Sequence, residues 1–449
     1  MTGATQGTNP LDTRRPVRVA VLGCGNVGAA LVGLLLTDSK GIAARSGISL
    51  ELAGVAVEDT SKVRPGVPEV LLTGNAMALV MDPTVDVVVE LIGGLDPARE
   101  LVMAALNAGK PVVTANKALL AANGAALADA AASAGVDLLY EAAVAGAIPI
   151  IRPLRESLAG ERVQRVMGIV NGTTNYILTT MSEEGASYAD ALADAQALGL
   201  AERDPTADVG GHDAAAKAAL LAGLAFRCDV VDSDVYREGI TEVPAADVAA
   251  ADRLGFVVKL LAIGERVGES EISVRVHPTM VPKSHPLAAV RGAFNAVFIE
   301  GETCGELMLY GRGAGGIPTA SAVLGDLIDA AHNLLAGSAA PAPARARAQL
   351  RPLSDVRTAY YLNVEVADRP GVLAAVATVF GDHGVSIRSM EQEGLGDEAR
   401  LIFLTHVARE GDVRATIADL EALPAVRLVA GVLRVVGSDV EPSDKVEGS

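Results

Sequence analysis

Aromatic residues are scarce in this chain. They make up 3% of its 449 residues and include no tryptophan, although half of all residues are apolar. The apolar content therefore rests mainly on alanine, valine and leucine. Alanine and leucine favour helices and valine favours strands, so a mixed α/β fold is expected. As a prior, a chain of this length corresponds to about three domains.

Cysteine is also rare. The three cysteines, Cys24, Cys228 and Cys304, lie far apart in the sequence, so no pair has the spacing of a zinc site, and an odd, sparse count favours a reducing compartment. The N-terminal segment "MTGATQGTNPLDTRRP" lacks the apolar centre of a signal peptide. No apolar run is long enough to span a bilayer. We therefore expect a soluble, cytoplasmic protein.

Positive charge is in the minority. The chain has 37 Lys and Arg residues against 55 Asp and Glu residues, which gives a formal net charge of −18. Such a chain repels phosphate backbones and anionic lipid headgroups, so neither a nucleic acid nor a membrane surface is expected as a partner. A small-molecule substrate fits this charge balance better.

Patterns along the chain predict its organisation. Near-continuous Val/Ile/Leu strands alternate with helices in the first third, which indicates a parallel, Rossmann-like sheet covered on both faces. The C-terminal part has the order βαββαβ of a ferredoxin-like unit, and a Pro/Ala-rich stretch before it is typical of a semi-rigid linker. The predicted parts are a disordered N-terminus (1–15), a dinucleotide-binding domain (16–138), a central α/β domain for substrate and dimerisation (139–336), the linker (337–357), the ferredoxin-like unit (358–437) and a polar tail (438–449).

A glycine-rich motif, "GCGNVG" from Gly23 to Gly28, fits the pattern G-x-G-x-x-G between a predicted strand and a predicted helix. In that context the first glycine makes the turn, the second lets a pyrophosphate approach the backbone, and the third lets the helix pack on the strand. The helix N-terminus then faces the phosphates. The motif predicts a dinucleotide site at Gly23, Gly25, Asn26, Val27 and Gly28. A glycine turn in an unrelated α/β protein is the alternative.

Charged residues follow the second predicted strand, in "VAVEDTSKVR". Glu58 or Asp59 can hold the ribose 2′-OH of NAD, and a carboxylate there repels the 2′-phosphate of NADP. Lys62 and Arg64 come directly afterwards and can bind that phosphate instead. The choice between NAD(H) and NADP(H) stays open, and the segment also fits an ordinary charged loop.

Two lysines are candidates for chemistry. Lys117 follows the strand in "VVTANK", at the sheet edge where open α/β sheets bind ligands, although a solvated lysine fits there equally well. Asp213 and Lys217 share one face if "DAAAKAALLAGLAF" is a helix. A surface ion pair is the simple explanation, but the following turns are almost wholly apolar, which places Lys217 at the border of the core. Partial loss of water favours the neutral form of a lysine and suits it to acid–base chemistry.

The most specific segment runs from Gly199 to Lys217, "GLAERDPTADVGGHDAAAK". It resembles the signature of homoserine dehydrogenases, G-x-x-x-x-D-P-x-x-D-x-x-G-x-D-x-x-x-K, at every fixed position. The stretches "VVTANKALL", "EAAVAGAIPI", "MGIVNGTTNYIL" and "YGRGAGGIPTASAVLGD" are similar to other segments of this family. The C-terminal unit resembles an ACT domain, including Asp368-Arg369-Pro370-Gly371 before its first helix. The resemblance covers most of the chain.

This resemblance implies reversible, NAD(P)H-dependent reduction of L-aspartate 4-semialdehyde to L-homoserine, in the pathway to threonine and methionine. It implies that Lys217 gives a proton to the carbonyl oxygen, with Lys117 as a second active-site lysine that also contacts the cofactor. It also implies a sodium ion held largely by backbone oxygens. The remaining expected site residues are Glu202, Asp208 and Asp213 for the substrate, Glu58, Lys62, Gly199 and Gly315 for the cofactor, and Glu141, Val144, Gly146 and Ile148 for sodium. His212 has no expected part.

Regulation and assembly are expected from the same resemblance. We expect threonine to bind at the ACT domain as a feedback inhibitor, and the chain to form a homodimer or homotetramer; a unit that only supports oligomerisation is the alternative. Family members that favour NADP often carry arginine at the position of Glu58, so a strict NADP preference is not expected here.

Two other functions stay open. A different dehydrogenase with an ACT domain, such as one acting on 2-hydroxy acids, would use a catalytic histidine with a carboxylate partner, and no such motif is evident. A non-catalytic amino-acid sensor is disfavoured by the intact set of Glu202, Asp213 and Lys217.

Overall fold

The computed structural model describes residues 15–340, 346–347, 349–394 and 397–436. The chain divides into two compact units, Met1–Gly160 with Gly311–Arg345 and Glu161–Tyr310 with Ala346–Ser449. The disordered N-terminus expected at residues 1–15 lies outside the described residues, except for Arg15. The polar tail expected at residues 438–449 lies outside them as well.

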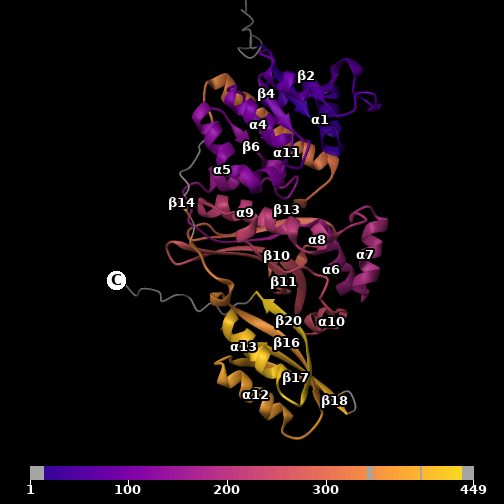
Figure 1. The fold of residues 1–449 in the computed structure, drawn as a ribbon, viewed down its shortest axis with the longest axis vertical. Helices are drawn as coiled ribbons and strands as arrows, with labels where there is room; N and C mark the ends of the chain where they lie inside the picture. The colour runs from indigo at the N-terminus through magenta and orange to yellow at the C-terminus, as the bar shows by residue number, and fades with distance from the viewer. Residues whose placement is uncertain (1–14, 341–345, 348, 395–396, 437–449) are drawn as a thin grey trace, which may run out of the picture. The chain divides into compact units, whose positions relative to one another are not determined.

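A six-stranded parallel sheet forms the centre of the first unit, in the order β3-β2-β1-β4-β5-β6 (Figure 1). This order, with helices between the strands, confirms the predicted Rossmann-like fold. The strands are β1 (Val17–Leu22), β2 (Leu50–Ala56), β3 (Leu72–Thr73), β4 (Val87–Glu90), β5 (Val112–Thr114) and β6 (Leu138–Leu139). The helices are α1 (Asn26–Thr37), α2 (Ser39–Ser46), α3 (Ala76–Met81), α4 (Ala98–Asn107) and α5 (Lys117–Ala134). Three short helical segments accompany them: η2 (Glu69–Leu71), η3 (Glu141–Ala143) and η4 (Pro153–Ser157).

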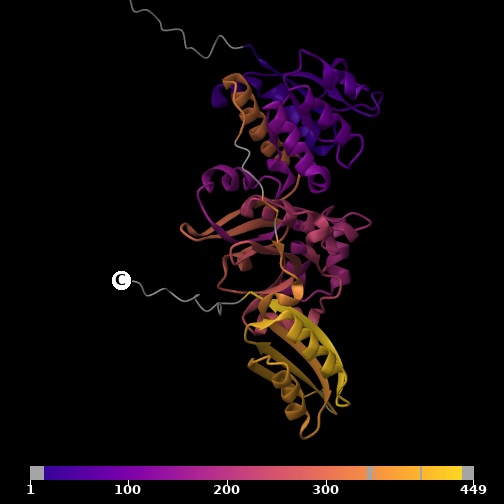
Figure 2. The ribbon, with the colours of Figure 1, turned by 60° about the vertical axis from the view of Figure 1, so that its left-hand side comes forward.

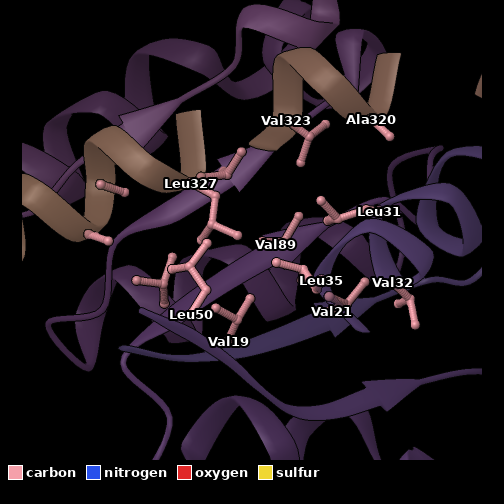
Figure 3. Packing of buried hydrophobic residues seen from close by; sticks show 14 of the residues in the cluster. Val19, Val21, Leu31, Val32, Leu35, Leu50, Val89, Ala320, Val323 and Leu327 are labelled. Carbon is pink, nitrogen blue, oxygen red and sulfur yellow. The ribbon is translucent and has the colours of Figure 1, made fainter. Parts of the chain in front are cut away.

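Helix α11 (Gly316–Ala336) comes from much later in the chain and completes one face of this sheet. Its residues Ala320, Val323 and Leu327 are buried in the same cluster as Leu31 and Leu35 of α1 (Figure 3). The other face is covered by α3, α4 and α5. Sequence periodicity identifies an amphipathic helix but not the sheet on which it packs, which is why α11 was grouped with the central domain.

The second unit, which Figure 2 shows from another side, is built on a twelve-stranded sheet. The main path of this sheet is β13-β12-β7-β10-β11-β20-β16-β18-β17. Helix α9 packs across β7, β10 and β11. The central strands are β7 (Val163–Ile169), β9 (Tyr236–Arg237), β10 (Phe256–Val267), β11 (Glu271–Pro282), β12 (Phe294–Gly301) and β13 (Gly305–Arg312). The helices are α6 (Gly172–Glu184), α7 (Tyr188–Ala197), α8 (Thr206–Val209), α9 (His212–Phe226) and α10 (Ala245–Arg253), with short segments η5 (Asp232–Asp234) and η6 (Pro286–Ala289).

The C-terminal part of this unit has the predicted βαββαβ order. Its elements are β16 (Arg357–Ala367), α12 (Val372–Asp382), β17 (Ile387–Gly394), β18 (Glu398–Thr405), β19 (Ala408–Arg409), α13 (Glu410–Glu421) and β20 (Val426–Val435). Strands β20, β16, β18 and β17 pair antiparallel over a core of their own. Strand β20 also pairs in parallel with β11, where Arg434 lies opposite Thr279. The ferredoxin-like sheet is thus a continuation of the central sheet.

The later part of the segment predicted as a linker, 337–357, makes backbone contacts within the second unit, whereas Ala340 donates a hydrogen bond to Asp137 of the first unit. Strand β14 (Ala346–Arg347) pairs with β8 (Cys228–Asp229), and β15 (Gln349–Leu350) pairs with β11. A short helical segment, η7 (Leu353–Asp355), follows. Two-residue pairings of backbone groups leave no apolar alternation in a sequence, so they could not be predicted.

Among the described residues, no single helix is long and apolar enough to cross a membrane. One bent pair, α1 with α2, meets that test by length and composition alone.

A buried carboxylate joins α11 to the loop after β6. Asp326 is 2% exposed, and its Oδ2 accepts a hydrogen bond from the backbone N–H of Glu141 at 2.7 Å. The Arg152 guanidinium lies 3.3 Å from its Oδ1. Burial raises the pKa of Asp326 to about 7, because removal from water penalises the charged form more than Arg152 and the N–H donor favour it.

The raised pKa of Asp326 predicts that the stability of the protein depends on pH. An acid whose pKa is higher in the folded than in the unfolded state stabilises the fold fully below its unfolded pKa, and this stabilisation is lost as the pH rises through the folded value. We expect the free energy of unfolding of Asp326→Asn to decline less than that of the parent between pH ~4 and ~7, by up to about 4 kcal/mol. Guanidinium unfolding at several pH values measures this. The exposed Asp129→Asn is the control, and equal pH profiles for parent and Asp326→Asn would contradict it.

Candidate active site

The glycine-rich loop lies between β1 and α1. Gly23 has φ +98°, and a Cβ there would come within 2.5 Å of the Leu91 carbonyl oxygen. A Cβ on Gly28 would lie 2.2 Å from the Gly23 carbonyl oxygen, whereas one on Gly25 would meet no atom within 4 Å. The outer glycines are thus required by the turn and by helix packing, and the middle one leaves open space at the start of α1. No side chain caps this helix, so its first N–H groups suit a phosphate.

The start of α11 lies beside this loop. Gly315 has φ +117° and precedes the helix, and a Cβ on Gly316 would come within 2.9 Å of the Asn26 carbonyl oxygen. The structure therefore brings Gly315 next to Asn26, as expected for residues that share one ligand. Gly199, which was assigned to the same cofactor site, belongs to the second unit and lies in the turn after α7 with φ +71°.

The charged segment after β2 is exposed at Glu58 and Lys62, whereas Arg64 is partly buried. The Arg64 guanidinium donates hydrogen bonds to the carbonyl oxygens of Asp59 and Lys62, both at 2.8 Å. Its charge also reaches the glycine-rich loop: burial raises the pKa of the Cys24 thiol, and Arg64 opposes that shift. Of the two cations in this segment, Arg64 is the one held in a fixed position.

Lys117 is the first residue of α5 and follows β5 at the carboxyl edge of the parallel sheet. Three buried polar residues fix this edge. The Glu90 carboxylate accepts hydrogen bonds from the Thr114 hydroxyl at 2.5 Å and from two N–H groups of the loop after β4. The Asn116 amide donates to the carbonyl oxygen of Gly94 at 2.7 Å. The backbone at the start of α5 is therefore tied to two neighbouring strands.

Two carboxylates of the second unit meet at one amide. Asn171 is 5% exposed and lies between β7 and α6. Its Nδ2 donates to Asp208 Oδ1 at 2.7 Å and to Asp213 Oδ2 at 3.0 Å, while its Oδ1 accepts the N–H of Thr174. Because the Oδ1 contact caps α6, the amide is held with both N–H groups turned toward the carboxylates.

Lys217 completes this cluster. It is 9% exposed, and its Nζ donates to Asp213 Oδ2 and to the Val170 carbonyl oxygen, both at 2.7 Å. The predicted helix is confirmed as α9, and the spacing of four residues places Asp213 and Lys217 on one face, as expected. An ammonium group has three donors, so two contacts among the described residues leave one N–H for a further acceptor.

Three other polar residues of the segment from Gly199 to Lys217 lie outside this cluster. Glu202 is exposed, and its backbone carbonyl accepts a hydrogen bond from Gln196. Asp204 accepts hydrogen bonds from the hydroxyl and N–H of Thr206, which makes it a turn residue before α8. His212 begins α9 and is exposed. The structure thus brings Asp208, Asp213 and Lys217 together, but not Glu202.

Sequence reasoning did not assign Asn171 or Glu90. Glu90 is the last residue of the otherwise apolar strand β4, and Asn171 comes two residues after β7. That position is the only sign of them in the sequence. Their importance arises from contacts with residues far along the chain, which periodicity does not reveal.

The loop predicted to hold sodium is buried in the first unit. The Glu141 carboxylate accepts three N–H groups, from Ile150, Ile151 and Arg152, at 2.5–2.9 Å. Among the described residues, no hydrogen bond reaches the carbonyl oxygens of Val144, Gly146 and Ile148, and no group of three or more His, Cys, Asp or Glu side chains is placed to hold a metal ion. Backbone oxygens are hence the ligands that this loop offers, and they fit a hard cation.

Comparison with protein families gives three matches that cover most of the chain. Residues 23–141 match the family model "Homoserine dehydrogenase, NAD binding domain", residues 149–328 match "Homoserine dehydrogenase", and residues 360–425 match "ACT domain". The chain belongs to the homoserine dehydrogenase family.

Individual homoserine dehydrogenases are similar over nearly their whole length. The enzyme of Corynebacterium glutamicum is 53% identical over 424 residues, which cover 93% of this chain and 95% of that protein. The enzyme of Mycobacterium tuberculosis H37Rv is 52% identical over 435 residues, covering 94% and 98%. The crystal structure of a homoserine dehydrogenase from Thiobacillus denitrificans superposes with a TM-score of 0.89 at 42% identity, covering 94% of this chain and 98% of that one.

Membership in the homoserine dehydrogenase family confirms the predicted activity class, an oxidoreductase with a nicotinamide cofactor. It also confirms the predicted ACT domain. A hyperthermophilic archaeal homoserine dehydrogenase, solved in complex with NADPH, superposes with a TM-score of 0.60 at 29% identity, covering 70% of this chain and 98% of that one. The rival activity of a 2-hydroxy-acid dehydrogenase is thereby excluded.

Proposed function

We propose that Lys217, Asp213 and Asp208 form the substrate and proton-transfer site for the interconversion of L-aspartate 4-semialdehyde and L-homoserine, a step toward threonine and methionine. When bound, NAD(P)(H) supplies or accepts the hydride. In the reducing direction, the Lys217 ammonium donates its third N–H to the carbonyl oxygen and gives up that proton as negative charge develops there. The observation that carries this proposal is the buried Lys217 Nζ, held by two acceptors with one N–H left over.

The charges of the cluster suit the amino-acid end of the substrate. Asp208 and Asp213 carry two negative charges and Lys217 one positive charge, so the cluster has a formal charge of −1. A substrate ammonium compensates that charge, and a partly buried ion gains most from an opposite charge close by. We also place the exposed Glu202 among the substrate-binding residues, and Lys117 at the carboxyl edge of the parallel sheet as the second active-site lysine and a cofactor contact.

For the cofactor, we propose that Gly23, Gly25, Asn26, Val27 and Gly28 bind the pyrophosphate, together with Gly315 and Gly199. The open space at Gly25 and the uncapped start of α1 support this assignment. Glu58 suits a ribose 2′-OH, and Lys62 or Arg64 suits a 2′-phosphate. We therefore propose that the enzyme accepts both NAD(H) and NADP(H), and that cation contacts with the 2′-phosphate favour NADP(H).

We propose a structural sodium ion in the loop after β6, held by oxygens of Glu141, Val144, Gly146 and Ile148. The three carbonyl oxygens that accept no hydrogen bond support this ion. The Glu141 carboxylate is occupied by three N–H donors, so we assign the backbone oxygen of this residue to the ion; this oxygen accepts one long hydrogen bond, from Val144 N–H at 3.4 Å, and keeps a second lone pair. Thermal unfolding in sodium chloride and in lithium chloride, at equal ionic strength, tests for this ion. Identical melting temperatures in the two salts would refute it.

For assembly, we propose a homodimer or homotetramer. Strand β13 lies at one edge of the large sheet, and Leu307, Met308 and Tyr310 on it are 37–53% exposed. An apolar, exposed edge strand favours pairing with a second copy. Sedimentation analysis distinguishes the two states from a monomer.

For regulation, we propose that threonine binds at the ACT domain and inhibits the enzyme. Gly371 precedes α12 with φ +89° and no side chain caps this helix, so its first N–H groups suit the carboxylate of an amino acid. The alternative is that the ACT domain only supports oligomerisation. In that case added threonine would not inhibit the enzyme through this domain.

The proton-donor role predicts a loss of turnover without loss of cofactor binding. Lys217→Met removes the donor, so kcat should fall by about 10²–10⁴-fold, while NADPH binding, followed by its fluorescence, stays unchanged. The exposed Lys283→Met is the control and should retain full activity. If Lys217→Met turns over like the parent, the proposed role is wrong.

The cofactor assignment predicts unequal effects of the two cations after β2. Because Arg64 is held in place and Lys62 is exposed, Arg64→Ala should lower kcat/KM for NADP(H) by about 10–100-fold, as expected for the loss of a charged hydrogen bond. The value for NAD(H) should change little. Steady-state kinetics with both cofactors measures this, with Lys62→Ala as the matched variant. An NADP preference that survives both substitutions refutes the assignment.

The sensor role predicts that a strained turn at α12 abolishes inhibition. Gly371→Ala adds a Cβ at a residue whose backbone is left-handed. This strain should displace the first N–H groups of α12. Added threonine should inhibit the parent and Gly384→Ala, which alters a left-handed glycine at the other end of α12. It should not inhibit Gly371→Ala. No inhibition of the parent, or equal inhibition of all three proteins, contradicts the role.

A further inference from the structure

A short segment of the second unit, residues 237–240, packs against the loop that carries the proposed substrate carboxylates. Ile240 N–H donates to the Val209 carbonyl oxygen at 2.8 Å. Gly239 lies so close that a Cβ there would come within 2.3 Å of the same oxygen and 2.8 Å of the Gly210 Cα. Val209 and Gly210 directly follow Asp208. This contact therefore holds the backbone next to Asp208 in place.

The next residue of the loop is enclosed from the same side. Gly211 has φ +78°, and a Cβ on it would lie 3.2 Å from Arg237 Cγ and 3.3 Å from the Glu238 carbonyl oxygen. Gly211 caps α9, the helix of Asp213. The segment 237–240 therefore contacts three of the four residues between Asp208 and Asp213, namely Val209, Gly210 and Gly211. Close-packed backbone transmits a displacement, because it has no empty space to absorb it.

The position of this segment is set by a residue of the ACT domain. Arg434 of β20 is 6% exposed, and its guanidinium donates two hydrogen bonds to the Glu238 carboxylate, at 2.8 and 3.0 Å. It also donates to Glu410 at 2.6 and 2.8 Å and lies over the Tyr236 ring at 5.5 Å. The Tyr236 hydroxyl donates to the same Glu238 carboxylate. Bidentate contacts fix orientation as well as distance.

A buried guanidinium between two carboxylates cannot exchange its partners with water at low cost. Burial opposes its charge, yet hydrogen bonds with Glu410 and Glu238 raise the pKa of Arg434 above its ordinary value. Removing one partner of such a set leaves a charge uncompensated in the interior. Because Arg434 also pairs opposite Thr279 in the β11–β20 ladder, Glu238 follows the position of the ACT sheet.

We propose that Glu238, Gly239 and Ile240 are positioning residues for the substrate site, and that Arg434 of the ACT domain holds them. Through this segment the ACT domain fixes the separation of Asp208 and Asp213, and with it the binding of the substrate's amino-acid end. The inference rests on the proposed role of these two carboxylates. It assigns the segment no contact with the substrate or the cofactor.

The first test adds a side chain at the closest contact, between Gly239 and Val209. Gly239→Ala should displace the loop at Val209 and raise KM for homoserine by about tenfold or more, with KM for the nicotinamide cofactor near the parent value and the melting temperature lowered by about 2–12 °C. The matched control is Gly381→Ala in α12, where a Cβ meets no atom within 4 Å. An unchanged KM for homoserine overturns the inference, and so does an equal rise of both KM values, because a general loss of structure affects both.

The second test concerns the clamp. Glu238→Gln and Arg434→Lys should each raise KM for homoserine selectively, and the double variant should be no worse than the stronger single variant, because both substitutions break one connection. Glu271→Gln is the control, since it breaks an ion pair with Arg351 on the same sheet. Additive effects of the two substitutions on KM would overturn the proposed connection between Arg434 and the segment 237–240.

Asp213→Asn separates the substrate-site proposal from the positioning proposal. If it leaves KM for homoserine unchanged, the proposed substrate site is wrong. If it raises KM for homoserine while Gly239→Ala has the KM of the parent, only the positioning proposal is refuted.

Discussion

The proposed substrate cluster depends on one buried amide between two carboxylates. Asn171 donates to both Asp208 and Asp213, which reduces the repulsion between these two like charges. The amide can do this because its oxygen caps α6 and fixes which way its N–H groups turn. Lys217 then balances one of the two charges. The remaining negative charge is the feature that suits a substrate ammonium.

We assign a different part of the chemistry to each compact unit. The parallel sheet of the first unit provides glycine turns and free N–H groups at its carboxyl edge, which is where such sheets bind nucleotides. The mixed sheet of the second unit provides a surface on which α9 packs, and Asp213 and Lys217 are buried on that helix. Because the ACT sheet continues that surface through β11 and β20, the ACT domain and the loop that carries Asp208 and Asp213 share one continuous set of contacts.

Local sequence patterns predicted the helices, strands and turns well. They predicted poorly which of these elements and side chains contact each other. The spacing of Asp213 and Lys217 and the apolar turns after them were enough to predict a partly buried pair on α9. The glycine pattern between a strand and a helix likewise predicted the turn at Gly23 and the packing at Gly28. Asn171, Glu90 and the clamp at Arg434 were not predicted, since each depends on contacts across long sequence separations. Helix α11 shows the same limit: its residues were placed in the central domain, because the sequence does not show which sheet it covers.

The central claim is that Lys217 meets the reacting oxygen while Asp208 and Asp213 meet the substrate ammonium. A crystal structure of the protein with homoserine and oxidised cofactor measures this directly. The account predicts the homoserine hydroxyl within about 2.7–3.2 Å of Lys217 Nζ, with its ammonium facing the two carboxylates joined by Asn171. A homoserine molecule whose hydroxyl faces another residue, or whose ammonium lies away from both carboxylates, would contradict it.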